Sequence, residues 1–190
     1  SLSLSTLDGS NGFRLDGIDA GDISGSSVSS AGDVNGDGFD DVLIGARLAD
    51  ETYLVFGKAS GFAASLSLSA LDGSNGFRLD GIDVDDGSGR SVSSAGDING
   101  DGFDDILIGA EGGDPGGVSN AGETYLVFGK ASGFAASFDL ATLDGSNGFR
   151  LDGIDVDDGG GKSVSSAGDV NGDGFDDVLI GAVYADPGGV

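Results

Sequence analysis

The chain of 190 residues contains no cysteine, histidine, methionine or tryptophan. Without cysteine no disulfide can form, and without cysteine and histidine there is no thiol nucleophile, imidazole base or ordinary zinc site. A Ser-His-Asp triad is excluded for the same reason. Proline occurs only twice, which excludes a proline-rich linker and a collagen-like repeat in spite of the abundant glycine.

Basic residues are also scarce: 8 Lys and Arg stand against 33 Asp and Glu, a formal charge of −25. Phosphate and anionic lipid headgroups repel such a chain, so neither nucleic acid nor an anionic membrane surface is an expected partner. No apolar run approaches the roughly 20 residues that span a bilayer. The first ten residues, SLSLSTLDGS, lack the basic and apolar blocks of a signal peptide. The lack of cysteine suits a cytosolic or an extracellular chain equally.

Glycine and aspartate dominate what is present, and they recur in long repeats. Glycine occurs 39 times, and only three of the acidic residues are glutamate. GSNGFRLDGID stands at 9–19, 73–83 and 145–155; SVSSAGD at 27–33, 91–97 and 163–169; ETYLVFGKASGFAAS at 51–65 and 123–137. The repeats differ in length mainly between 47–50 and its counterpart 111–122, which indicates a surface loop. Internal repeats of this length are typical of repeat architectures.

Each unit shows four short predicted strands between turns rich in Gly, Asp and Asn. In the first unit they are 13–18, 27–31, 41–46 and 52–56. The sequence DVLIGA at 41–46 is almost continuously apolar, as in a strand buried on both faces. Residues 65–71 fit either a strand or a helical turn, and their copy at 137–143 favours the turn.

Four antiparallel strands per repeat predict an all-β fold made of β-propeller blades, with about two complete blades and partial ones. The small residues of 27–31 suit the crowded strand nearest a propeller axis. An extended β-array remains an alternative. A β-helix is disfavoured because its repeat is nearer 20 residues.

The strongest chemical signal is the motif D-x-N-G-D-G-F-D-D, which follows the predicted inner strand in every unit. Side-chain oxygens at positions 1, 3 and 5 of a curled loop converge, the glycine at position 6 permits the sharp turn, position 7 offers a carbonyl and position 9 a carboxylate. Hard oxygen donors favour Ca²⁺ over transition metals. Simple Asx turns are the alternative, but three copies of crowded carboxylates at the same offsets favour a bound cation. An EF-hand is excluded because position 12 is Ile44 or its equivalent inside an apolar strand.

The motif therefore predicts three calcium sites, one per repeat. The predicted ligands are Asp33, Asn35, Asp37, the Phe39 carbonyl and Asp41; Asp97, Asn99, Asp101, the Phe103 carbonyl and Asp105; and Asp169, Asn171, Asp173, the Phe175 carbonyl and Asp177.

These residues carry a family resemblance. The stretch SVSSAGDVNGDGFDDVLIGA followed by ETYLVFG resembles the FG-GAP repeat, the blade of integrin α-subunit propellers and of many bacterial surface proteins. The resemblance implies a propeller of usually seven blades with calcium in the hairpin between the first two strands. It also implies an extracellular or cell-surface, bacterial protein. The expected division is an outer strand of a preceding blade at 1–23, blades at 24–87 and 88–159, and a partial blade at 160–190.

The favoured function is a non-catalytic, calcium-binding scaffold for adhesion or protein–protein interaction. A structural spacer, a filament-forming or engineered repeat unit, and an accessory domain of a secreted hydrolase are the alternatives. The residues that break the repeat are expected to form no constellation: Ile23, Arg47, Leu48, Arg90, Lys162 and Tyr184. A catalytic site is therefore not predicted.

Two kinds of partner are expected. Open blade edges favour self-association, into a closed ring or a head-to-tail filament. The rim opposite the calcium loops carries clustered aspartates at 19–22, 83–86 and 155–158, which form a solvated acidic surface, a second cation site or a contact for a basic partner. A protein or glycan ligand is expected at that rim.

Overall fold

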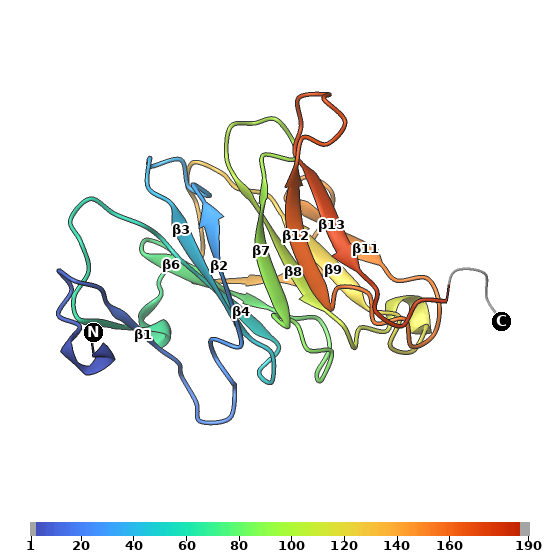
Figure 1. Cartoon of the computed structure of the whole chain (residues 1–190), viewed down its shortest axis with the longest axis horizontal. Coiled ribbons are helices and arrows are strands. Elements are labelled where there is room, and N and C mark those ends of the chain that lie inside the picture. Colours follow the sequence, from blue (N-terminus) through green and yellow to red (C-terminus); the bar gives the residue numbers. More distant parts are fainter. Residues whose placement is uncertain (1–2, 187–190) are drawn as a thin grey trace.

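The computed structural model of the chain describes residues 3–186, which form a row of small β-sheets joined by tight turns (Figure 1). Among these residues there is no α-helix, and four single-turn 3-10 helices interrupt the loops: η1 (Leu4–Thr6), η2 (Leu68–Ala70), η3 (Pro115–Gly117) and η4 (Leu140–Thr142). No helix in this part of the chain is both long and apolar enough to cross a membrane.

The sheets confirm the predicted all-β fold of propeller blades. Blade 1 contains β2 (Ser27–Gly32), β3 (Asp41–Ala46), β4 (Glu51–Val55) and β6 (Gly76–Asp80). Blade 2 contains β7 (Ser91–Gly96), β8 (Asp105–Ala110), β9 (Glu123–Val127) and β11 (Gly148–Asp152). Within the described residues, blade 3 contains β12 (Ser163–Gly168) and β13 (Asp177–Gly181). In each blade, strands consecutive in this order pair antiparallel.

Three short strands connect neighbouring blades. The ambiguous segment 65–71 divides into β5 (Ser65–Ser67) and the helical turn η2, and its copy divides into β10 (Ser137–Asp139) and η4. Both interpretations of this segment were thus half right. β5 pairs in parallel with β1 (Arg14–Asp16), and β10 pairs in parallel with β6 of blade 1. The β10–β6 pair ties the outer strand of blade 1 to the segment that leads into the outer strand of blade 2, whereas β1 and β5 form a separate two-stranded sheet.

The hydrophobic core lies between the blades because each middle strand presents side chains to both neighbours. Leu43 and Leu54 of blade 1 belong to the same buried cluster as Ile106 and Ile108 of blade 2. Leu107 projects from the other face of β8, in a second cluster against blade 3. Every residue of β8 is buried. The continuous apolar sequence of this strand is explained by burial on both faces.

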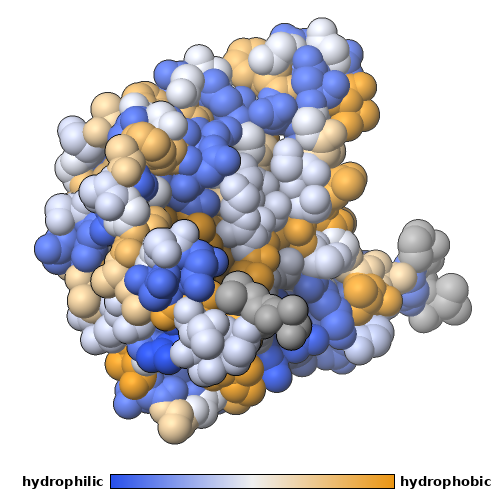
Figure 2. Space-filling model, turned by 60° about the vertical axis from the view of Figure 1, so that its left-hand side comes forward, coloured by the Kyte–Doolittle hydropathy of each residue, from blue (hydrophilic) through white to orange (hydrophobic). Residues whose placement is uncertain are grey.

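The connections of the blades gather at two opposite edges. The loops β2–β3, β7–β8 and β12–β13 all lie along the upper edge in Figure 1, and the β3–β4 and blade-to-blade connections lie along the lower edge. The predicted metal loops thus share one edge. On the face turned forward in Figure 2, hydrophobic side chains stand in patches between hydrophilic ones.

Candidate metal centres and the opposite groove

The three predicted metal loops are tightly curled connections that begin directly after an inner strand. Just before the first loop the strand bulges, with a register shift between Ser30 and Gly32. Inside it, Gly36 and Gly38 have φ values of 71° and 87°. Only glycine adopts this left-handed conformation without strain, so the two glycines allow the chain to curl back on itself. The corresponding glycines of the other two loops share this conformation.

The side chains at loop positions 1, 3 and 5 turn inward onto the loop's own backbone. In the first loop, Asp37 N donates to Asp33 Oδ1 at 2.9 Å and to Asn35 Oδ1 at 2.8 Å. Gly38 N donates to Asp33 Oδ2 at 2.9 Å. The same bonds recur in the second loop, on Asp97 and Asn99, and in the third, on Asp169 and Asn171. Three copies of one hydrogen-bond pattern show that the motif fixes the loop conformation.

The carboxylate at position 9 ties each of the first two loops to the end of the third strand of its blade. Asp41 is buried; its Oδ2 accepts from Val34 N at 3.1 Å and its Oδ1 from Gly57 N at 2.9 Å. Asp105 makes the equivalent bonds to Ile98 N and Gly129 N. In the third loop Asp177 accepts from Val170 N at 2.8 Å.

Burial makes the charge of the position 9 carboxylates unfavourable. It raises the pKa of Asp41 to about 7, although two backbone N–H groups oppose this shift, and repulsion from Asp37 and Asp33 adds to it. Asp105 shows the same shift to about 7, with burial as the main cause. Asp169, the carboxylate at position 1 of the third loop, is exposed and behaves differently. Hydrogen bonds from backbone N–H groups, chiefly that of Gly174, lower its pKa. A cation beside Asp41 and Asp105 would offset both the burial and the repulsion.

The donor set fits a hard cation, although it is not arranged as a finished coordination shell. Each loop offers three carboxylates, an amide oxygen and backbone carbonyls, and a carboxylate oxygen that accepts one N–H still has a free lone pair. Within residues 3–186, no group of three or more acidic side chains is placed so that it could hold a metal ion. In the first loop the oxygens of positions 1, 3 and 5 accept backbone N–H groups of the loop itself. The predicted ligands lie together in each loop, and their coordination of calcium stays a prediction.

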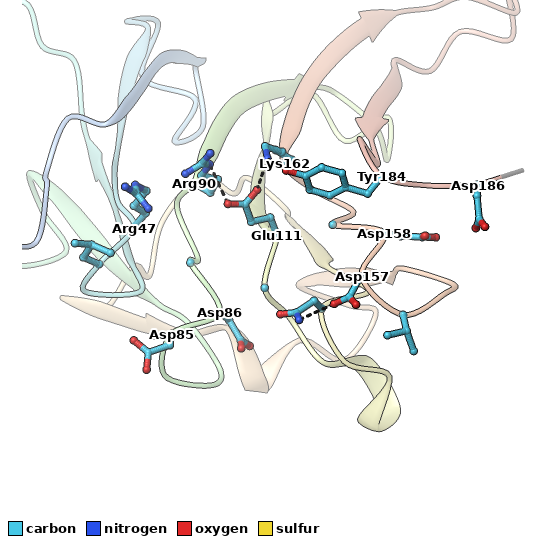
Figure 3. Close-up of a pocket in the computed structure, with 16 residues that line it drawn as sticks. Arg47, Asp85, Asp86, Arg90, Glu111, Asp157, Asp158, Lys162, Tyr184 and Asp186 are labelled. Carbon is cyan, nitrogen blue, oxygen red and sulfur yellow. Dashed lines mark hydrogen bonds and ion pairs between the residues drawn. The ribbon is translucent and has the colours of Figure 1, made fainter. Parts of the chain in front are cut away.

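At the opposite edge lies a groove with a volume of about 750 Å³, and charged side chains gather in it (Figure 3). Its basic side chains are Arg47, Arg90 and Lys162. Glu111 lies between the last two, 3.4 Å from Arg90 Nε and 3.3 Å from Lys162 Nζ. Lys162 Nζ also lies 3.2 Å from the Tyr184 hydroxyl and 4.8 Å from the ring centroid.

The groove also has an acidic side. Asp86 is only 7% exposed, and its Oδ2 has no hydrogen-bond partner. Burial first, and then repulsion from Asp83 and Glu123, raises the pKa of Asp86 to about 6. Asp157 differs because its carboxylate accepts from Asn120 Nδ2 at 2.9 Å. The predicted aspartate-rich rim is therefore partly buried and partly bonded within the chain.

The groove corrects one expectation from the sequence. The residues that break the repeat were expected to form no constellation, which is wrong for Arg47, Leu48, Arg90, Lys162 and Tyr184, because all five line this groove. They come from three different units, and only the packing of the blades brings them together. The repeat did offer one sign of this grouping in the sequence. Arg90 and Lys162 occupy the same position in two units, and Arg47 and Glu111 occupy a second shared position.

Comparisons with known proteins agree with this architecture. A model of the FG-GAP repeat matches residues 24–65, 88–127 and 160–190. The chain is 30% identical over 181 residues to integrin alpha-4 of Xenopus laevis, which covers 92% of this chain and 16% of that protein. It is 31% identical over 176 residues to integrin alpha-5 of Xenopus laevis, with the same coverage. Against integrin alpha-V of Gallus gallus it is 29% identical over 167 residues, 85% of this chain and 15% of that protein.

The chain spans about a sixth of the length of these relatives. All three are animal proteins, so the expectation of a bacterial source remains a prediction. The repeat match covers more than half of the chain and falls on the blades seen in the structure. The chain belongs to the FG-GAP repeat family and is similar to integrin alpha chains.

Proposed function

We propose that this chain is part of a calcium-stabilised β-propeller that works outside the cell in adhesion or protein–protein interaction and has no catalytic role. The observation that carries this proposal is the buried carboxylate at loop position 9. Asp41 and Asp105 are almost fully buried beside other carboxylates, and burial raises the pKa of each to about 7. A divalent cation held by the loop would relieve this local cost.

The calcium sites would act mainly on folding. Asp33, Asp37 and Asp41 would hold the ion together with the Asn35 amide oxygen and the Phe39 carbonyl, and the other two loops would do the same with their equivalent residues. A bound Ca²⁺ supplies positive charge that the acidic loop lacks. Because Asp41 also bonds Gly57 N, a loop fixed in this way stabilises the end of β4 as well as the hairpin. Calcium is plentiful outside cells, where sites of millimolar affinity are filled.

The groove at the opposite edge is the proposed ligand surface. It lies away from the metal loops and combines basic, acidic and aromatic side chains, a mixture that suits a polar protein or glycan surface. Arg47 carries a charge that Glu111 does not bridge, whereas Arg90 and Lys162 share that carboxylate. We infer that an acidic group of a ligand would meet Arg47 and Arg90. The relatives named above are integrins, which agrees with an adhesive role.

A catalytic role is not proposed, because the charged groups of the groove mostly neutralise one another. Glu111 is held between two cations and Asp157 is bonded to Asn120, so neither of these two carboxylates is free to act as an acid or base. A structural spacer or a filament-forming unit is the second candidate, and it is favoured by the exposed apolar side chains of blade 3, such as Leu179 and Tyr184.

Calcium titration calorimetry on the purified chain tests the metal sites. We expect three bound ions for the native chain and two for Asp37→Ala, because that loop loses its position 5 ligand. Asp8→Ala is the matched control: this carboxylate also serves a turn, accepting from Ser10 N at 2.9 Å, but lies outside the metal loops. The control should bind three ions. If the native chain binds no calcium, or Asp37→Ala binds as many ions as the control, the calcium part of the proposal is wrong.

A further inference from the structure

Asparagine is followed by glycine at six of its seven positions in this chain. In such a pair the glycine nitrogen can attack the asparagine side-chain carbonyl, because a five-membered ring closes within the chain and glycine has no Cβ to obstruct it. Three of the pairs occupy positions 3 and 4 of the metal loops, and three lie outside them. The asparagines are Asn11, Asn35, Asn75, Asn99, Asn147 and Asn171.

In the second metal loop a carboxylate holds the N–H of the attacking group. Gly100 N donates to Asp97 Oδ1 at 2.8 Å. A carboxylate at hydrogen-bond distance can take up a proton as the nitrogen that carries it forms a new bond. The third loop repeats this contact, from Gly172 N to Asp169 Oδ1 at 2.6 Å. The attacking nitrogen and a general base for it are therefore already in contact.

The carbonyl that would be attacked is also prepared. Asn99 Oδ1 accepts from Asp101 N at 2.9 Å. Negative charge develops on this oxygen as the ring closes, and an N–H donor that is already in place stabilises it. Within residues 3–186, Asn99 Nδ2 donates to no acceptor, so nothing restrains the nitrogen that must leave. The loop thus arranges a base, a nucleophile and an oxyanion donor around one carbon.

The first metal loop has the same residues but lacks half of this arrangement. In the described part of the chain Gly36 N donates to neither Asp33 nor any other acceptor. Asn35 Nδ2 donates to Asp37 Oδ2 at 3.2 Å, which restrains the leaving nitrogen. A Cβ at the position 4 glycine of either loop would collide with a phenylalanine ring of the following blade, so the packing is alike. The two loops differ in their bonding at the reacting atoms.

The pairs before β6 and β11 are held in an unreactive arrangement. Asn75 Oδ1 accepts from Asp72 N at 3.1 Å, and its Nδ2 donates to Ala70 O at 3.0 Å. Asn147 makes the equivalent two bonds. The glycine that follows Asn75 is buried at the start of β6. Both ends of each amide are fixed away from the glycine nitrogen, so these pairs serve as internal controls.

We propose that the second metal loop modifies itself and converts Asn99 to aspartate or isoaspartate. The Gly100 N–H proton passes to the Asp97 carboxylate, the nitrogen bonds to Asn99 Cγ, and the Cγ–Nδ2 bond breaks. The leaving nitrogen takes the proton from Asp97 and departs as ammonia, which leaves a cyclic imide. Water then opens the imide at either of its two carbonyls and yields a new carboxylate. Water is the only other reactant.

The product changes the loop irreversibly. The new carboxylate adds a negative charge at position 3, between the acidic residues Asp97 and Asp101. Opening to isoaspartate also adds one carbon to the main chain of a loop whose glycines set its curl. The inference does not depend on calcium binding, because every reacting group belongs to the chain and the test is made in chelator.

Peptide mapping by mass spectrometry tests this proposal on the purified chain incubated in EGTA. The Lys and Arg residues place the six Asn-Gly pairs in six different tryptic peptides, so each pair is followed separately. The exchange of an amide NH₂ for OH raises the mass of the peptide, and fragmentation locates the residue. The folded chain is compared with the chain in urea, where the loops are lost.

Two matched variants test the base. Asp97→Asn keeps an acceptor of the same shape but cannot take up the proton, and Asp33→Asn makes the same change in the first loop. Circular dichroism checks that both variants are folded. The comparison of Asn99 with Asn35 within the native chain needs no variant, so it decides the question even if Asp97→Asn does not fold.

In the folded native chain we expect Asn99 and Asn171 to lose their amides at least about tenfold faster than Asn35, and Asn75 and Asn147 to react most slowly. Asn99 should react faster in the folded chain than in urea, where the six rates should converge.

Asp97→Asn should slow the reaction of Asn99 at least about tenfold and leave Asn171 unchanged, whereas Asp33→Asn should leave Asn99 unchanged. The proposal fails if Asn35 reacts as fast as Asn99 in the folded native chain, if folding does not accelerate the reaction of Asn99, or if a folded Asp97→Asn variant reacts at the native rate.

Discussion

At the scale of single residues, the chain concentrates unfavourable charge where a functional surface is proposed. Asp86 lies in the groove with a buried oxygen that has no hydrogen-bond partner, and burial followed by repulsion from Asp83 raises its pKa from 3.8 to about 6. A raised carboxyl pKa means that the folded chain holds this proton more tightly than the unfolded chain does. The charged form of Asp86 therefore lowers the stability of the fold at neutral pH.

We expect Asp86→Asn to stabilise the chain at pH 7 by on the order of 1 kcal/mol, because the substitution removes the buried charge. Between about pH 4 and pH 6 the folded state binds more protons than the unfolded state, so this part of the stability falls as pH rises. The gain of the variant should therefore shrink toward zero near pH 4. Urea unfolding at both pH values measures it, with calcium present to keep the metal loops constant. An equal gain at pH 4 and pH 7 would contradict the assigned cause.

The sequence predicted the curled loops but not the hydrogen bonds inside them, and the role of their residues as metal ligands stays a prediction. Spacing alone placed Asp33, Asn35 and Asp37 in one curled loop, because position-specific glycines and short polar side chains restrict that loop strongly. It could not show that their oxygens accept N–H groups of the loop itself. That outcome depends on the competition between backbone donors and a cation, which no spacing rule contains.

At the scale of elements, strands with a strong apolar sequence were predictable and short connecting strands were not. DVLIGA at 41–46 coincides with β3, since burial on both faces requires an unbroken apolar run. β5 has only three residues, SLS, and its partner β1 belongs to the preceding repeat. Parallel pairing over such a distance leaves no local pattern in the sequence.

The repeat offers a matched pair of strand positions that differ only in their neighbours. Leu107 in β8 is completely buried, and Leu179 in β13 is the same residue of the next repeat but 61% exposed. We expect Leu107→Ala to lower the free energy of unfolding by about 3 kcal/mol, because it leaves a cavity between blades 2 and 3. Leu179→Ala should lower it by less than about 1 kcal/mol at concentrations where the chain is monomeric.

Chemical denaturation of both variants at low micromolar concentration measures this difference. Similar losses at the two positions would mean that blade 3 is covered in solution even at high dilution. A small loss at Leu107 would contradict the shared core between blades 2 and 3.

At the scale of the whole molecule, the blades unite residues that no single repeat could connect. Glu111 bridges Arg90, which precedes blade 2, and Lys162, which precedes blade 3. These residues differ from one repeat to the next, so they look like unrelated differences when each repeat is considered alone. The sequence predicted the acidic rim at this edge, but it could not predict that Glu111 pairs with Arg90 and Lys162, because that contact depends on how the blades pack.

The formal charge of −25 has a further consequence for the whole fold, because salt of any kind weakens the repulsion between exposed carboxylates. The stabilisation of the fold by calcium must therefore be compared with that by a salt that screens the carboxylate repulsion equally. If each loop binds one ion, calcium at ten times the dissociation constant adds about 1.4 kcal/mol per site. NaCl of the same ionic strength gives the screening contribution alone.

We expect the melting temperature of the chain to rise clearly more in CaCl₂ than in ionic-strength-matched NaCl, and to return to the NaCl value when EGTA is added. Differential scanning calorimetry at fixed protein concentration measures both salts, so that any change in self-association is held constant. Asp37→Ala should lose about a third of the calcium-specific increase, since one of three loops is disabled. Equal melting temperatures in the two salts would mean that calcium acts by screening, and the crowded carboxylates of the loops would then be stabilised by their backbone N–H bonds alone.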